Sequence, residues 1–237
     1  MRTIIKPGFG SRAVGAKAAS FGHSFGGGQN YRGTRPRKTK GAVHLLFRFN
    51  LRDPAAPIRW NGPKWLPLFY CFQYDGCPIG YKVISNWQIE ILELDYSRYT
   101  KDFPYQDYPE YFREVPVSLK PIRYEEQRAE VFANHLRQHG VYKGVLKGRD
   151  EAIVESVGLE FTKIGGLHDL LQDLTSTKCP DRQCANHKSA FGMQVFATIW
   201  NEPLKGIDIW QSQGEPILIV YQICTRCGAI YALNQCT

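Results

Sequence analysis

The chain has 237 residues, of which 43% are hydrophobic and 13% aromatic, and its formal net charge is +8. This length suits one large domain or two small ones, and no run of 18 apolar residues predicts a membrane-spanning helix. The charge is uneven, because residues 1–41 hold nine Lys or Arg and no acidic residue, whereas residues 42–237 hold 21 basic and 22 acidic residues. We therefore expect electrostatic attraction to a partner to come mainly from residues 1–41.

Residues 1–41 are also rich in Gly and Ser, a composition that buries too little apolar surface to offset the entropy of ordering. We predict a flexible basic Gly-rich arm, followed by a body over 42–237 with a first half at 42–150 and a second half at 151–237. The arm is open to four interpretations: a solvated tail, a nucleic-acid-binding arm, an organellar transit peptide or a docking segment for an assembly. Cations suited to phosphate contacts are Arg32, Arg35, Arg37, Lys38 and Lys40.

The body alternates apolar, β-branched and aromatic runs with turn residues, which predicts mostly β-structure. The predicted strands cover residues 43–51, 65–74, 81–84, 87–94, 159–166, 193–200, 216–223 and 229–233. One helix is predicted over 124–139, since acidic residues begin it, basic residues end it and Gly140 follows. The predicted fold class is α+β, with a mostly antiparallel β-sheet and one clear helix.

Residues 95–116 combine tyrosines with prolines, which is typical of a long surface loop. Tyrosine gives large contact area at low entropic cost, so this loop is a candidate protein interface. The interface candidates are Tyr99, Tyr105, Tyr108 and Tyr111. In the alternative interpretation, the same rings pack down onto the sheet.

Two parts of the body resemble each other. Residues 45–50 form a strand pattern that is followed, after a loop with prolines, by a second pattern at 68–72. Residues 195–200 and 217–221 repeat this arrangement about 150 positions later. The pattern favours a weak internal duplication of a β unit.

Four cysteines in the last third form two pairs, Cys179-x4-Cys184 and Cys224-x2-Cys227, with 39 residues between the pairs. Two such turns facing each other give the tetrahedral thiolate cage of zinc-ribbon knuckles. Gly228 follows the last cysteine, where a knuckle needs a residue that tolerates positive φ. We predict a structural Zn²⁺ held by these four cysteines, with the alternative that they are merely buried thiols.

His187 and Cys236 are reserve ligands in this prediction, because His187 lies three residues beyond Cys184 and Cys236 lies near the last pair. Four cations surround the cysteines in sequence: Lys178, Arg182, Lys188 and Arg226. They are expected to balance the −2 charge of a four-thiolate zinc centre, with a nucleic-acid contact as the alternative.

The remaining sequence offers little catalytic chemistry. Nucleotide-binding glycine motifs, a Gly-x-Ser-x-Gly elbow and a His-Glu-x-x-His motif are absent. Cys71 and Cys77 flank a turn at x5 spacing, which is weak support for redox chemistry. Seven cysteines without a secretory signal favour a reducing cytoplasmic location, and a four-sulfur cage leaves no open metal position. These features predict a protein that is not an enzyme.

The order of these motifs resembles YwqG-like bacterial proteins of unknown function. The resemblance rests on Gly165-Gly166, the two cysteine pairs and the strand at 195–199 between them; it is distant, covers 42–237 and lies mainly in 159–237. It implies a mixed α+β fold in a bacterial or phage cytosolic protein, a role as an immunity or interaction module and no catalytic residue. We therefore expect a zinc-stabilised module that binds another protein, with nucleic-acid binding through the basic arm as the alternative.

Overall fold

The protein was analysed as a computed structural model, which describes residues 4–18, 20–27, 40–60, 62–86, 88–128, 131, 161–166, 168, 170–174, 178–189, 192–211 and 217–236. Strands dominate these residues: β1 Ile4–Ile5, β2 Ser11–Gly15, β3 His23–Phe25, β4 His44–Asn50, β5 Ile58–Arg59, β6 Trp65–Tyr70, β7 Ile79–Val83, β8 Ile89–Glu93, β9 Val115–Pro121, β10 Lys163–Ile164, β11 Met193–Trp200, β12 Ile217–Cys224 and β13 Ile230–Cys236. Short 3₁₀ turns occur at η2 (Tyr96–Arg98) and η3 (Ala185–Lys188), and residues 124–128 are α-helical.

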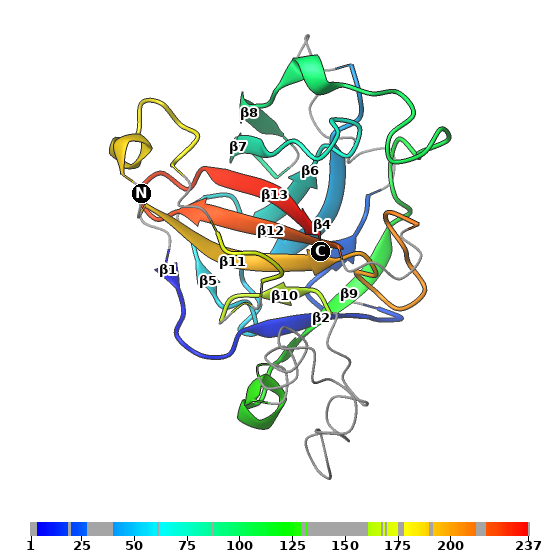
Figure 1. The fold of residues 1–237 in the computed structure, drawn as a ribbon. Helices are drawn as coiled ribbons and strands as arrows, with labels where there is room; N and C mark the ends of the chain where they lie inside the picture. Colours follow the sequence, from blue (N-terminus) through cyan, green and yellow to red (C-terminus); the bar gives the residue numbers. More distant parts are fainter. Residues whose placement is uncertain are drawn as a thin grey trace.

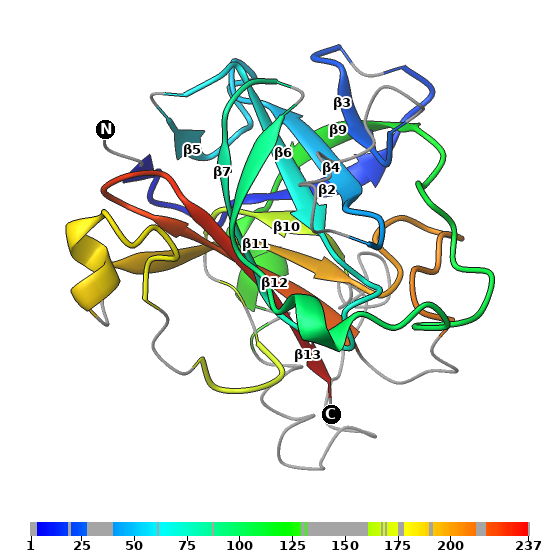
Figure 2. The ribbon, with the colours of Figure 1, turned by 90° about the horizontal axis from the view of Figure 1, so that it is seen from above.

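Eleven of these strands form one antiparallel sheet in the order β6-β4-β3-β9-β2-β10-β11-β12-β13-β7-β8, and β1 pairs separately with β5. The sheet curls into a half-barrel in which β4 and β6 lie behind β11, β12 and β13 (Figures 1 and 2). The predicted fold class, mostly antiparallel sheet with one helix, is confirmed. No helix among the described ranges is long and apolar enough to cross a membrane.

A buried tyrosine bridges the gap between β6 and β7. The Tyr81 hydroxyl on β7 accepts a hydrogen bond from the Phe69 backbone N–H at 3.1 Å and donates to the Pro67 carbonyl at 3.2 Å. Both partners lie on β6, the first strand of the sheet order. A side chain thus satisfies edge groups that would otherwise need a ladder of backbone hydrogen bonds.

The strand register supports the predicted duplication. In the β4–β6 pair the register shifts between Leu45 and Phe47, and in the β11–β12 pair it shifts between Val195 and Ala197. The two bulges therefore start at positions 45 and 195, which reproduces the offset of about 150 predicted from the sequence. Because a bulge is a specific interruption of the ladder, its recurrence at equivalent positions is stronger evidence than similar composition.

The neighbouring strands extend this equivalence. We call the strand pairs β4–β6 and β11–β12 the first and second hairpin. Phe25 of β3 pairs with Phe47, and Ile164 of β10 pairs with Ala197, so β3 and β10 occupy matching places beside these two hairpins. Each of these short strands is followed by a glycine with positive φ, Gly26 at +64° and Gly165 at +66°. A side chain at Gly26 or Gly165 would also collide with neighbouring atoms, so both turns require glycine.

Part of the predicted flexible arm is folded, which corrects the boundary at residue 41. Strands β2 and β3 lie inside the large sheet, and His23, Ser24 and Phe25 are all buried. The composition was misleading because the ordering comes from backbone pairing with β9 and β10 rather than from a large apolar content. The candidate cations Arg32, Arg35, Arg37 and Lys38 lie outside the described residues, and Lys40 is exposed.

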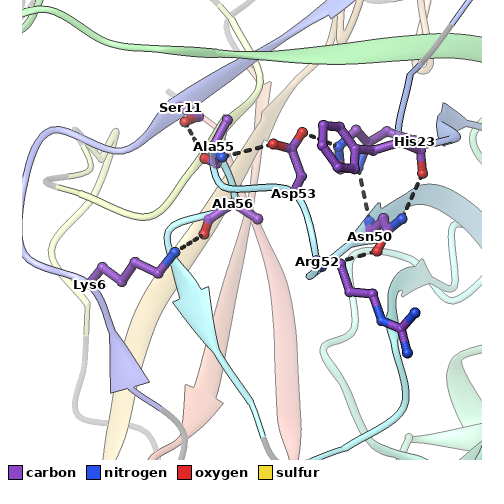
Figure 3. Close-up of polar contacts among 9 residues, drawn as sticks. Lys6, Ser11, His23, Asn50, Arg52, Asp53, Ala55 and Ala56 are labelled. Carbon is purple, nitrogen blue, oxygen red and sulfur yellow. Dashed lines mark hydrogen bonds and ion pairs between the residues drawn. The ribbon is translucent and has the colours of Figure 1, made fainter.

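Polar contacts fasten this N-terminal segment to the loop after β4 (Figure 3). Lys6 Nζ donates to the Ala56 carbonyl at 2.9 Å, and Ser11 Oγ donates to the Ala55 carbonyl at 2.6 Å. His23 Nε2 lies 2.7 Å from Asp53 Oδ2. These contacts help to hold the Gly-rich N-terminal segment in place.

The tyrosine-rich loop packs largely onto the barrel interior, as the alternative interpretation predicted. Tyr108 is buried, contacts Phe72 with ring centroids 5.2 Å apart and donates its hydroxyl to the Ile209 carbonyl at 2.9 Å. Tyr99 and Tyr105 are half-buried against the same core, whereas Tyr111 is 36% exposed. Tyr108 therefore presents no surface to a partner, and the interface role of the other three remains a prediction.

The sequence interpretation missed β9 because Pro116 and Pro121 read as strand breakers. Val117 and Leu119 nevertheless face the interior with the period of a strand, and β9 pairs with both β2 and β3. The predicted helix over 124–139 is confirmed at residues 124–128, and residue 131 is also helical. The rest of that range lies outside the described residues.

Removing the Tyr81 hydroxyl should destabilise the fold. We expect Tyr81→Phe to lower the free energy of unfolding by about 1–3 kcal/mol, because the Phe69 N–H is left buried without its acceptor. The matched control is Tyr221→Phe, since the equally buried Tyr221 hydroxyl has no hydrogen-bond partner among the described atoms. Urea unfolding should give a neutral or slightly stabilising effect for the control, and equal effects of the two variants would contradict this account.

Candidate metal centre

The first cysteine pair lies on the loop between β10 and β11. Cys179 and Cys184 flank a turn in which the Cys184 N–H donates to the Asp181 carbonyl at 2.9 Å, and Cys184 then caps η3. Both cysteines are buried. The x4 spacing, wide for a knuckle, is thus accommodated by a closed turn that leads directly into a 3₁₀ helix.

The second pair lies at the hairpin between β12 and β13. Cys224 is the last residue of β12, and Cys227 lies in the turn that follows. The Gly228 N–H donates to the Cys224 carbonyl at 2.9 Å, and Gly228 has φ +75°. The sequence-based prediction that this glycine supplies positive φ is therefore confirmed.

The tertiary fold brings the two pairs together. The four Sγ atoms of Cys179, Cys184, Cys224 and Cys227 all lie within 4.8 Å of one another. The separations across the pairs are 3.4 Å for Cys179–Cys227 and 3.8 Å for Cys184–Cys224. A tetrahedral zinc with Zn–S bonds of about 2.3 Å requires sulfurs about 3.8 Å apart. The four cysteines fit a metal ion of this kind without rearrangement of the backbone.

Hydrogen bonds to the sulfurs complete the geometry of a metal site. The neighbouring thiols of Cys179 and Cys227 lower the pKa of the Cys224 thiol, and the nearby backbone N–H groups of Cys227 and Arg226 lower it further. The neighbouring thiols of Cys224 and Cys227 raise the pKa of Cys179. Four sulfurs this close cannot all ionise unless a cation compensates them, so metal binding must release protons.

Contacts outside the cage hold the first knuckle against β7. A methyl group at Gly80 would lie 2.4 Å from Cβ of Pro180, so the close approach requires glycine at that position. Asp181 forms a short ion pair with Lys82, which lowers the pKa of Asp181 and raises that of Lys82. Such outer contacts orient the ligands and limit how far the knuckle can move.

The structure excludes both reserve ligands from the cage. Cys236 pairs with Ile217 at the start of β12, whereas Cys224 ends that strand, about 23 Å away at a rise of about 3.3 Å per residue. His187 Nδ1 lies 2.7 Å from the Cys179 carbonyl, and its ring is not among the close ligand atoms. The His187 side chain therefore contacts the backbone of the first knuckle. Cys236 lies nine positions after Cys227, and this separation, most of it along a single strand, could have revealed that it is far from the second pair.

The other cysteine candidates show no activation. Cys71 is fully buried, and burial raises the pKa of its thiol. Leu68 and Tyr221 are equivalent, because each is the first partner after the bulge in its strand pair. Cys71 follows Leu68 by three residues, as Cys224 follows Tyr221, so Cys71 occupies the place in the first hairpin that Cys224 occupies in the second. Burial also raises the pKa of Cys77. A thiol with a raised pKa is a poor nucleophile, so neither cysteine gains support for the redox interpretation.

A buried His–Asp pair exists, but its geometry is structural. His23 Nδ1 accepts a hydrogen bond from the Asn50 backbone N–H at 2.9 Å, so the proton of the neutral ring lies on Nε2 and points to Asp53 (Figure 3). Burial lowers the pKa of His23 despite this carboxylate. Both ring nitrogens are occupied within the fold, which leaves neither one for a substrate. The pair was not apparent from the sequence, since its members are 30 residues apart with no motif between them.

No protein-family model, curated protein or solved structure matches this chain. The resemblance to YwqG-like proteins therefore stays a prediction.

The metal content can be tested by substitution. We expect purified wild-type protein to contain about one equivalent of zinc, and the Cys224→Ser, Cys227→Ser double variant to contain none, because two of four thiolates are removed. Cys236→Ser is the matched control and should keep the metal. Mass spectrometry for metals measures both, and loss of zinc in the control variant would contradict the assigned ligands.

Mild acidification should lower the free energy of unfolding, because His168 takes up a proton when the protein unfolds. Burial, reinforced by nearby Lys163, lowers the pKa of His168 to about 3, and its Nδ1 lies 3.1 Å from Thr198 Oγ1. The unfolded state takes up the proton near pH 6.5, so the stabilising contribution is complete above that pH and is lost as the pH falls toward about 3. The expected slope is at most about 1.4 kcal/mol per pH unit from this residue.

Urea unfolding between about pH 5 and 6.5 measures this effect, because carboxylates stay ionised in that window. His168→Asn, which can keep a hydrogen bond to Thr198, should give a flatter dependence on pH than wild type. His23 adds a contribution of the same sign in both proteins, since its folded-state pKa is also lowered. An unchanged slope in the variant would show that His168 does not titrate as described.

Proposed function

We propose that this chain is a non-enzymatic protein-interaction module whose C-terminal half is stabilised by a structural Zn²⁺. The observation that supports it best is the set of four cysteine sulfurs within 4.8 Å of one another. Four thiolates would complete the coordination shell of zinc, so no position is left for a reacting water. A zinc centre of this kind acts on folding rather than on a substrate.

We further propose that the partner is another protein, that the role is immunity-like in a bacterium or phage, and that the chain belongs to the YwqG-like family. The proposal also includes a reducing cytoplasmic location, in which these cysteines remain available to the metal. A structural zinc contributes about 10–16 kcal/mol of apparent binding free energy. This is as large as the net stability of a typical domain, about 5–15 kcal/mol. The binding surface of the module would therefore depend on the metal.

The two equivalent hairpins allow an internal test of the structural role. On removal of zinc by a chelator, we expect amide hydrogen exchange to accelerate first at the β12–β13 turn and in residues 178–189. The end of β6 is the position equivalent to the end of β12. It is held by apolar packing of Cys71 and Phe72 and should keep its protection from exchange. Equal loss of protection at both hairpins would contradict a local structural role.

The binding function is tested by selecting peptides from a display library on the zinc-loaded protein. Peptides that bind wild type and fail to bind the Cys224→Ser, Cys227→Ser variant would support a zinc-dependent interaction surface. The alternative is nucleic-acid binding through the basic N-terminal segment. That alternative predicts retention of duplex DNA with a log–log salt slope of about −0.9 per phosphate contact.

Deleting residues 1–41 is not a clean test of the alternative, because the deletion would also remove β2 and β3 from the sheet. Replacing Arg32, Arg35, Arg37 and Lys38 with Gln leaves those strands intact. Loss of DNA retention in this variant, with no zinc-dependent peptide selected, would overturn the proposal in favour of the alternative.

A further inference from the structure

An open hollow of about 800 Å³ adjoins the cysteine cage. Two of the four metal-ligand candidates, Cys184 and Cys227, line it, so the cage forms part of its wall. The polar side chains that line it include Arg182, Gln183, Lys188 and Arg226. They come from the turn and η3 of the first knuckle and from the second knuckle, so the hollow has its present shape only while the two knuckles are held together.

The hollow carries more positive charge than the cage requires. Arg182, Lys188 and Arg226 are exposed, and none of them belongs to an ion pair found among the described residues. The carboxylate in the lining, Asp181, is already paired with Lys82. A zinc with four thiolates has a charge of −2. Three cations around it therefore leave a net positive surface that is open to a ligand.

We propose that this hollow binds the carboxylate side chains of an acidic segment in a protein partner. The inference rests on the proposed function and specifies the chemistry of its partner. Arginine presents a planar fork that pairs with a carboxylate through two hydrogen bonds, and the hollow offers two arginines from opposite knuckles. Charged contacts of this kind mainly set specificity and the association rate.

An acidic peptide fits the hollow better than a nucleic acid does. No aromatic side chain is among the residues that line it, so stacking of bases has no platform there. On the side of Arg182, an adjacent hollow is lined by Glu93 and Asp95. A nucleic-acid backbone that continued in this direction would meet carboxylates, whereas a short acidic segment can end within the basic region.

The test uses the full zinc-loaded chain and a short fluorescent peptide of about four glutamates, with binding measured by fluorescence anisotropy. The variant Arg182→Gln, Lys188→Gln, Arg226→Gln should bind this peptide at least about tenfold more weakly than wild type. The matched control removes three exposed lysines outside the hollow, Lys101→Gln, Lys120→Gln and Lys205→Gln. It should bind nearly as wild type does, and zinc content must stay at one equivalent in both variants.

If the triple variant loses zinc, the double variant Arg182→Gln, Lys188→Gln replaces it, because it leaves the residue between Cys224 and Cys227 unchanged. Absence of peptide binding by wild type, or equal weakening in the lysine control, would overturn the inference. So would tighter binding of a single-stranded DNA oligonucleotide that is lost in the same variant. These outcomes are independent of the zinc and peptide-display measurements, so the module itself can be confirmed while the acidic partner is rejected.

Discussion

The convergence of two cysteine pairs at one point joins two segments of the C-terminal half that are separated by 39 residues in the chain. Cys179 and Cys184 lie on a loop with little regular structure, and Cys224 and Cys227 lie at the end of a hairpin inside the large sheet. Without a common ion, four sulfurs within 4.8 Å would hold few charges and contribute only weak hydrogen bonds. With an ion, the loop becomes part of the sheet's rigid frame, and the hollow between the knuckles gains a fixed shape.

The two equivalent strand pairs differ at the end where the cysteine cage lies. Both hairpins have the same bulge and the same neighbouring short strand, yet they end differently. The β6 end continues into Cys71 and Phe72, which are buried in the aromatic interior, and the β12 end carries the knuckle. Similarly, β12 pairs with β13 through a full ladder, whereas β6 meets β7 through the Tyr81 hydroxyl. Both halves share one apolar core, and the second half alone carries the candidate metal site at the end of its strand pair.

The knuckles are also connected to the rest of the barrel by contacts that need no metal. Pro180 packs against Gly80, and Asp181 pairs with Lys82, so the loop is anchored on β7 while the ligands converge from β12. This anchoring positions Arg182 next to the hollow. If the proposed function holds, the same turn supplies thiolate ligands to the metal and cations to the partner, so the stability of the fold and the binding of a partner would be coupled at this end of the molecule.

The sequence alone was sufficient for the features that depend on local spacing. It predicted the four cysteines, the positive φ of Gly228, the strand of residues 193–200 and the offset of about 150 between the hairpins, since each is encoded in a few neighbouring residues. Only the tertiary structure decided the rest. It excluded Cys236, because the β12–β13 register places it at the far end of the strand, and it buried Tyr108 against Phe72 in the aromatic interior. It also ordered β2 and β3 in a glycine-rich segment, because their backbone groups pair with β9 and β10, strands that are distant in the chain.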